Sequence, residues 1–142
     1  MESKVILLTG ASSGIGFQTA EHLAKQGHKV YGAARRVEQI EALKHLGVVP
    51  LMLDLTEEAS IAEAVAHVIA REKRIDVLIN NAGYGLLGAV EDVELSEARK
   101  QFEVNVFGLA AITKAVLPYM RAQKQGTIIN ISSIAGRISM PF

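Results

Sequence analysis

Short apolar runs of strand length alternate along this chain with segments in which apolar residues recur at helical spacing. The runs occupy residues 4–9, 29–34, 48–53, 75–79 and 127–131. Each is continuous rather than alternating, which is typical of a strand buried on both faces of a parallel sheet. The helical spacing predicts helices over 14–26, 37–46, 60–72 and 96–123. Ser60 and Glu63 have the spacing of a capping box, which predicts the start of the third helix.

This alternation predicts an α/β fold. Strands that are separated by helices form a parallel sheet covered on both faces, and right-handed crossovers then give a doubly wound, Rossmann-like sheet in the order 3-2-1-4-5. A helical bundle with apolar loops is disfavoured, because β-branched runs recur between the helices. Residues 1–142 are therefore expected to form one three-layer α/β/α domain.

A glycine-rich turn joins the first strand to the first helix, with its glycines in the spacing G-x-x-x-G-x-G. Glycine lets the backbone approach a ligand closely, and the free N–H groups of a helix N-terminus attract phosphate. The spacing differs from the common G-x-G-x-x-G fingerprint, and a turn that serves only chain reversal is the alternative. Its position favours a diphosphate ligand. The residues expected to contact that ligand are Thr9, Gly10, Ser12, Ser13, Gly14, Ile15 and Gly16.

The end of the second strand predicts which dinucleotide binds. An acidic residue there would bind the ribose hydroxyls of NAD, but Ala33 and Ala34 are followed by Arg35 and Arg36. Arginine suits a phosphate because its donors form a planar fork with a permanent charge. NADP(H) is therefore favoured over NAD(H). The alternatives are that both arginines only begin a solvated helix, or that one stacks on the adenine.

Polar residues also follow the third and fourth strands. Asp54 is either an acceptor for the adenine amino group or a turn residue before Thr56, and the sequence leaves both open. The segment from Asn80 to Gly83 follows the fourth strand. The first and fourth strands flank the point where the strand order reverses, so their carboxyl ends border the ligand crevice. The segment is therefore expected to contact the cofactor.

Charge and composition exclude several other functions. The 15 basic residues balance 15 acidic ones, and aromatic residues make up 5%, so neither nucleic acid nor an anionic membrane is an expected partner. The absence of cysteine excludes disulfides and thiolate metal sites. None of the histidines follows a predicted strand, so no metal site is expected; they are His22, His28, His45 and His67. The first apolar run is too short for a signal peptide or a membrane span, and we expect a cytoplasmic protein.

Taken together, these motifs resemble those of the short-chain dehydrogenase/reductase family, in its shorter single-domain branch. The resemblance spans essentially the whole chain. It rests on residues 9–16, 54–55, 80–83 and 105, and on 130–133 with Gly136. It implies that Leu55, Asn81, Ala82 and Gly83 contact the cofactor. Weaker similarity around Tyr84 to Leu87 and at Met140 to Phe142 is to members that act on hydrophobic alcohols and ketones.

The resemblance also implies the chemistry. Such enzymes transfer a hydride between nicotinamide and a carbonyl or alcohol carbon, and use an Asn, a Ser, a Tyr and a Lys. Asn105 would hold a water through its backbone carbonyl, and Ser133 would bind the substrate oxygen, with Ser132 as the alternative. The Tyr would transfer the proton, with its pKa lowered by the Lys. Members are usually dimers that pack the long helix against a partner copy, so a homo-oligomer is expected.

One part of the family pattern is missing from these residues. The Tyr-x-x-x-Lys motif would fall a few residues beyond Phe142, and none of Tyr31, Tyr84 and Tyr119 is followed four residues later by a lysine. Tyr84 either borders the substrate pocket or packs on the surface. We therefore expect the domain to be incomplete at its C-terminus and to leave the fifth strand as an apolar sheet edge. Two hypotheses result: the N-terminal portion of an NADP-dependent oxidoreductase, or a non-catalytic dinucleotide-binding or interaction module.

Overall fold

The computed structural model describes residues 2–138, in which five strands form one parallel sheet in the order β3-β2-β1-β4-β5. The predicted fold class and strand order are confirmed. The strands are β1 (Val5–Thr9), β2 (Lys29–Ala34), β3 (Val49–Met52), β4 (Val77–Asn80) and β5 (Thr127–Asn130). The α-helices are α1 (Gly14–Lys25), α2 (Glu58–Glu72), α3 (Leu95–Phe102) and α4 (Leu109–Gln123). The predicted similarity at Met140 to Phe142 lies outside the described residues.

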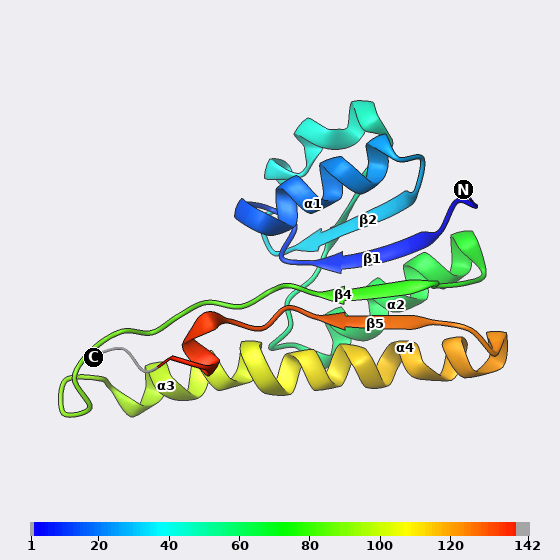
Figure 1. Ribbon diagram of the computed structural model, residues 1–142. Coiled ribbons are helices and arrows are strands. Elements are labelled where there is room, and N and C mark those ends of the chain that lie inside the picture. Colours follow the sequence, from blue (N-terminus) through cyan, green and yellow to red (C-terminus); the bar gives the residue numbers. More distant parts are fainter. Residues whose placement is uncertain (1, 139–142) are drawn as a thin grey trace.

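The central strand β1 is buried on both faces, as its continuous apolar run predicted. Val5 and Leu7 belong to one core cluster, whereas Ile6 and Leu8 belong to a second cluster on the opposite face. This division follows from the two-residue period of a strand. Helices α2 and α4 cover the first face and α1 covers the second (Figure 1). The sheet edge at the carboxyl ends of the strands is thereby left free to bind a ligand.

The segment predicted as a helix over 37–46 forms two 3-10 helices instead, η1 (Val37–Gln39) and η2 (Glu41–Leu46). Ile40 and Leu43 are both buried and lie three residues apart, which matches the three-residue turn of a 3-10 helix. Gly47 has a φ of 89° and ends η2. The predicted helical segment is therefore present, as two short 3-10 helices rather than one continuous helix.

The capping-box prediction at Ser60 was also wrong. Helix α2 begins at Glu58, and its N-cap residue Glu57 makes no side-chain cap bond. The Ser60 hydroxyl instead accepts the backbone N–H of Asp54 at 2.9 Å. Ser60 therefore connects helix α2 to the end of β3, close to the crevice.

The long helix predicted over 96–123 is interrupted. A π-helix, η3 (Glu103–Gly108), separates α3 from α4. Gly108 ends this π-helix where it meets Leu55, and a Cβ atom at Gly108 would lie 2.6 Å from the Leu55 carbonyl oxygen. Glycine therefore allows the helix to pass close to the residue that follows β3 and Asp54.

At the edge of the sheet, β5 is only partly covered. Ile128 packs on the cluster formed with α2 and α4, whereas Ile129 is 42% exposed. Its position at the edge was expected from the sequence. No helix in the part of the chain that the structure describes is both long and apolar enough to cross a membrane.

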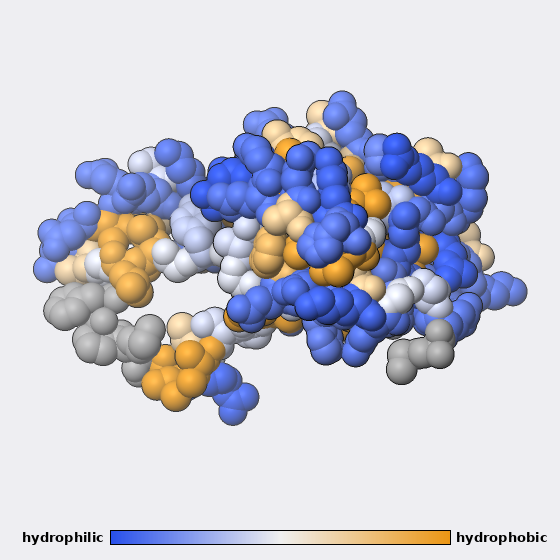
Figure 2. Space-filling model, turned by 90° about the horizontal axis from the view of Figure 1, so that it is seen from above, coloured by the Kyte–Doolittle hydropathy of each residue, from blue (hydrophilic) through white to orange (hydrophobic). Residues whose placement is uncertain are grey.

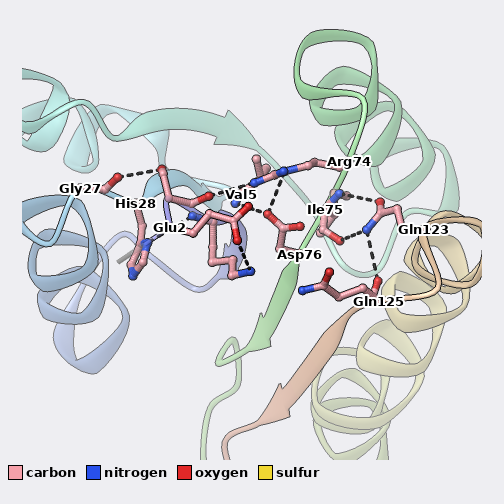
Figure 3. A network of polar contacts seen from close by, with 11 residues as sticks. Glu2, Val5, Gly27, His28, Arg74, Ile75, Asp76, Gln123 and Gln125 are labelled. Carbon is pink, nitrogen blue, oxygen red and sulfur yellow. Dashed lines mark hydrogen bonds and ion pairs between the residues drawn. The ribbon is translucent and has the colours of Figure 1, made fainter.

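A polar network closes the opposite end of the sheet, where the strands begin (Figure 3). The Asp76 carboxylate accepts the Val5 backbone N–H at 2.7 Å and lies 3.0 Å from Nε of Arg74. The Gln123 amide pairs with both backbone groups of Ile75. Asp76 is buried but 40% of the Arg74 side chain is exposed. We therefore expect the hydrogen bond to Val5 to stabilise the fold more than the solvent-screened ion pair does.

We predict that Asp76→Ala lowers the free energy of unfolding by about 2–3 kcal/mol, because it leaves the buried Val5 N–H without an acceptor. Asp76→Asn keeps an acceptor and loses only the charge, so it should cost about 1 kcal/mol or less. Urea unfolding of the two variants and the unaltered chain checks this order. Equal losses in the two variants would show that the charge, rather than the hydrogen bond, dominates.

Candidate functional site

A single cleft of about 810 Å³ runs along the carboxyl ends of the five strands. Most residues predicted to bind cofactor or substrate line this cleft; Gly14 does not, and neither does Asn80, whose buried amide bonds Thr113 and Asn130 instead. Those that line it are Thr9, Gly10, Ser12, Ser13, Ile15, Gly16, Arg35, Arg36, Asp54, Leu55, Asn81, Ala82, Gly83, Asn105 and Ser133. The fold thus brings together residues from turns far apart in the sequence. Their individual roles stay predictions.

The turn between β1 and α1 leaves the start of the helix uncapped. Ser13 occupies the N-cap position but makes no side-chain cap bond, and the first turn contains no acidic residue. The first N–H groups of a helix have no acceptor within it. Side chains that usually satisfy or neutralise them are therefore missing here, so the amide groups and the positive end of the helix dipole are available to an anion.

Two glycines allow this turn to close tightly against the segment after β4. A Cβ atom on Gly16 would lie 2.2 Å from the Gly10 carbonyl oxygen and 2.5 Å from Nδ2 of Asn81. Gly10 has a φ of 69°, and its Cβ would lie 2.8 Å from the Cα of Ala82. Gly14 has a φ of 53°, but a Cβ there would meet nothing within 4 Å. Gly14 therefore serves backbone conformation, Gly16 serves close packing, and Gly10 serves both.

Hydrogen bonds join the ends of β1 and β4. The buried Thr9 hydroxyl accepts the backbone N–H groups of Asn81 and Ala82, at 3.1 and 3.0 Å. In return, Nδ2 of Asn81 donates to the carbonyls of Thr9 and Gly10, at 3.0 and 3.2 Å. We call these bonds the Thr9–Asn81 junction. It makes the glycine turn and the residues after β4 a single unit.

The ends of β2 and β3 carry the charges of the cleft. Arg35 and Arg36 are both exposed and line it. Oδ1 of Asp54 accepts the backbone N–H and the hydroxyl of Thr56, at 2.9 and 2.8 Å. The Thr56 N–H, helped by its hydroxyl and by the charge of Arg35, lowers the pKa of Asp54. Asp54 is thus an ionised turn residue, and its role as an adenine acceptor stays a prediction.

At the other end of the cleft, the Asn105 side chain holds the segment after Gly83. Its Nδ2 donates to the Tyr84 carbonyl at 2.8 Å, and its Oδ1 accepts the Tyr84 N–H at 3.1 Å. Gly83 lies so close that a Cβ there would be 3.2 Å from the same Oδ1. Asn105 sits within the π-helix η3, and this irregular turn brings it to the cleft. Irregular helical turns of this kind are frequent at functional sites.

Ser133 caps a short 3-10 helix, η4 (Ile134–Gly136), after β5. Its hydroxyl oxygen accepts the Ala135 N–H at 3.1 Å. Because the oxygen serves here as an acceptor, the hydroxyl hydrogen stays available to donate. Ser132 lines the cleft as well, so the cleft lining does not distinguish the two serines.

The sequence did not single out several residues that line the cleft. These are Gln101, Leu109 and Ala135. Gln101 donates from Nε2 to the Tyr84 carbonyl at 3.1 Å. Its spacing of four residues from Asn105 indicates a shared helix face and is the one signal that could have found it. Among residues 2–138, no group of His, Asp or Glu side chains is arranged to hold a metal ion.

Known proteins with similar sequences support this description. The family model described as short chain dehydrogenase matches residues 4–142. The chain is 46% identical to the 3-ketodihydrosphingosine reductase of Bacteroides thetaiotaomicron over 100% of its own length and 51% of that protein. The chain spans about half the length of the curated relatives it matches.

Solved structures agree with the observed fold. A short-chain dehydrogenase from Streptomyces avermitilis matches with a TM-score of 0.93 and 42% identity, over 99% of this chain and 53% of that one. A metagenomic short-chain oxidoreductase in complex with NADP matches with a TM-score of 0.90 and 35% identity, over 97% of this chain and 66% of that one. The predicted resemblance is confirmed, and the chain belongs to the short-chain dehydrogenase/reductase family.

Proposed function

We propose that the protein is an NADP(H)-dependent oxidoreductase that transfers a hydride between nicotinamide and a carbonyl or alcohol carbon. The observation that carries this proposal is the uncapped start of α1, which faces a cleft that also contains Arg35, Arg36 and Ser133. A free helix N-terminus suits a diphosphate, and the arginines suit a further phosphate. One elongated, multiply phosphorylated ligand accounts for both features.

The shape of the turn fits a dinucleotide. Gly10 and Gly16 keep the floor of the turn free of side-chain atoms, because any Cβ there would overlap neighbouring backbone or the Asn81 amide. Ser12 and Ser13 line the opening with small side chains. The backbone amides of residues 13–16 would then hold the diphosphate, while Thr9, Leu55, Asn81, Ala82 and Gly83 would border the path of the cofactor.

The preference for NADP(H) rests on the end of β2. Ala33 and Ala34 stand where a carboxylate would bind the ribose hydroxyls of NAD, and the exposed guanidinium groups of Arg35 and Arg36 follow directly. The charge of Arg35 acts on the ionised Asp54, whereas no such interaction with Asp54 is seen for Arg36. Arg36 is therefore our first choice for the 2′-phosphate.

When it is bound, NADPH supplies the hydride. This chain would orient and polarise the acceptor: the free hydroxyl hydrogen of Ser133 would bond the carbonyl oxygen and stabilise the negative charge that develops on it. The resemblance assigns the proton path to the Asn105 backbone carbonyl and a water. We place the Tyr and Lys that complete proton transfer outside residues 1–142, since no tyrosine here has the required lysine.

The substrate that we propose is a carbonyl compound with a large apolar part. Figure 2 shows apolar side chains gathered at the end of the molecule that holds α3 and the segment after β5. Exposed apolar residues of α3 and of the segments on either side of it and after β5 include Leu87, Val90, Leu95, Phe102, Ile134 and Ile138. The relative that is 46% identical is named a 3-ketodihydrosphingosine reductase. We therefore choose 3-ketodihydrosphingosine as the first probe.

The proposal is tested by comparing the chain of residues 1–142 with the product of the complete gene. We expect both to bind NADPH, and only a product that carries Tyr-x-x-x-Lys to oxidise NADPH with 3-ketodihydrosphingosine or a shorter ketone. Loss of NADPH absorbance is the measurement. NADPH binding without turnover by the complete gene product would favour a non-catalytic dinucleotide-binding module. Turnover by residues 1–142 alone would contradict our placement of the proton donor.

We predict that Arg36→Ala weakens NADPH binding about tenfold or more, because it removes a charge-assisted contact to the extra phosphate. Arg35→Ala should have a smaller effect, since Asp54 already offsets part of its charge. NADH affinity should change less than about twofold in either variant. Lys29→Ala removes the same charge at the opposite end of β2 and is the matched control. Tighter binding of NADH than of NADPH by the unaltered chain would refute this assignment.

We predict that Gly16→Ala lowers the free energy of unfolding by about 2–3 kcal/mol and abolishes measurable NADPH binding, because its Cβ must displace the Gly10 carbonyl and Asn81. Gly14→Ala is the matched control. It meets no neighbouring atom, so it should cost only the roughly 1 kcal/mol of an unfavourable φ and retain NADPH binding. Thermal unfolding and NADPH titration measure both effects. Equal behaviour of the two variants would argue against close packing at Gly16.

A further inference from the structure

We infer that Gln101 is a positioning residue for the substrate end of the cleft and that it acts through the backbone of Tyr84. Gln101 lies in the last turn of α3, and no hydrogen-bonding role was predicted for it from the sequence. The inference rests on the proposed function, because it concerns how the same cleft holds its carbonyl substrate.

The Tyr84 peptide is held by side chains from one helical segment. Its carbonyl oxygen accepts Nδ2 of Asn105 at 2.8 Å and Nε2 of Gln101 at 3.1 Å, while its N–H donates to Oδ1 of Asn105 at 3.1 Å. A carbonyl oxygen has two lone pairs, so the two amides together saturate it. We call these three residues the Tyr84 clamp.

The hydrogen bonds of the Tyr84 clamp fix the position of a segment that has little apolar packing against α3. Helix α3 contains no buried residue, and Tyr84 itself is 44% exposed. Segments with few buried contacts open at low free-energy cost. Ala82 and Val104 still pack against the core, and beyond them the hydrogen bonds from Gln101 and Asn105 hold the segment after Gly83 against the helical segment.

The position of Tyr84 connects the clamp to substrate binding. Tyr84, Gln101 and Ser133 all line the cleft, whereas the glycine turn and the arginines line its cofactor part. A substrate whose oxygen is bonded to Ser133 would fill the end that Tyr84 borders. Loosening the Tyr84 peptide should therefore weaken substrate binding while leaving the Thr9–Asn81 junction and the amides of residues 13–16 intact.

Two substitutions of Gln101 distinguish loss of its hydrogen bond to the Tyr84 carbonyl from repulsion of that carbonyl. Gln101→Ala removes one of the two donors to the Tyr84 carbonyl. Gln101→Glu keeps a similar chain length but faces the carbonyl with an ionised acceptor, so it should loosen the peptide further. Lys100→Ala, on the adjacent exposed position of the same helical turn, is the matched control.

The first measurement is amide hydrogen exchange over residues 82–87 in the product of the complete gene. We expect exchange to become about tenfold faster in Gln101→Ala, and faster still in Gln101→Glu, with no change in Lys100→Ala. Exchange over residues 9–16 should be the same in all variants. Unchanged exchange over 82–87 in both Gln101 variants would overturn the inference.

The second measurement is steady-state reduction of 3-ketodihydrosphingosine. We expect the KM of Gln101→Ala to rise about three- to tenfold, with kcat and NADPH affinity within about twofold of the unaltered protein. A parallel fall of kcat, NADPH affinity and melting temperature would indicate a structural role only and overturn the inference, as would an unchanged KM. Absence of turnover by the unaltered protein would instead contradict the proposed function, so the two failures are distinguishable.

Discussion

The cleft depends on the Thr9–Asn81 junction, in which two neighbouring parallel strands exchange hydrogen bonds just beyond their last ladder pair. The Thr9 hydroxyl satisfies two backbone N–H groups of the segment after β4, and the Asn81 amide satisfies two carbonyls of the turn after β1. Backbone groups that leave a sheet must find other partners when they are partly buried. Because the groups at the ends of β1 and β4 pair with each other, they do not bond the N–H groups at the start of α1. Those N–H groups remain available to bind an anion in the cleft.

The junction also explains which glycines the turn requires. Asn81 can reach the carbonyls of Thr9 and Gly10 only because Gly16 and Gly10 have no Cβ in the intervening space. Adding one atom at either position would separate the helix start from the strand ends and disturb both sets of bonds. A Cβ at Gly14 would meet no neighbour, so glycine is needed there only for the positive φ of its backbone. The spacing of the glycines therefore reflects close packing at Gly10 and Gly16 and a positive φ at Gly10 and Gly14.

Strands and helices that follow from the spacing of apolar residues could be predicted from the sequence. Features that depend on which of several hydrogen-bond partners a group finds in the folded chain could not. The run from Val5 to Thr9 identified a doubly buried strand, because every side chain in it needed an apolar neighbour. The π-turn around Asn105 was missed because one extra residue per turn barely alters a pattern of apolar positions. Ser60 was misassigned because its hydroxyl can either cap its own helix or accept the Asp54 N–H. The fold brings Asp54 close enough for the second bond to form. Gln101 was missed because its partner is a backbone carbonyl, so only its spacing of four residues from Asn105 could have indicated it.

The two ends of the cleft are held together by different means, and this difference bears on function. The end proposed to bind the diphosphate rests on the buried Thr9 and on glycines packed against backbone, so its donors are fixed before any ligand arrives. The end proposed to bind the substrate rests on Tyr84 and Ser133, which lie on exposed segments and are ordered mainly by hydrogen bonds to nearby groups. Preorganised donors favour tight, invariant recognition, whereas exposed segments accept changes of side chain at little cost to the fold. A fold built in this way can keep one cofactor while its substrate changes.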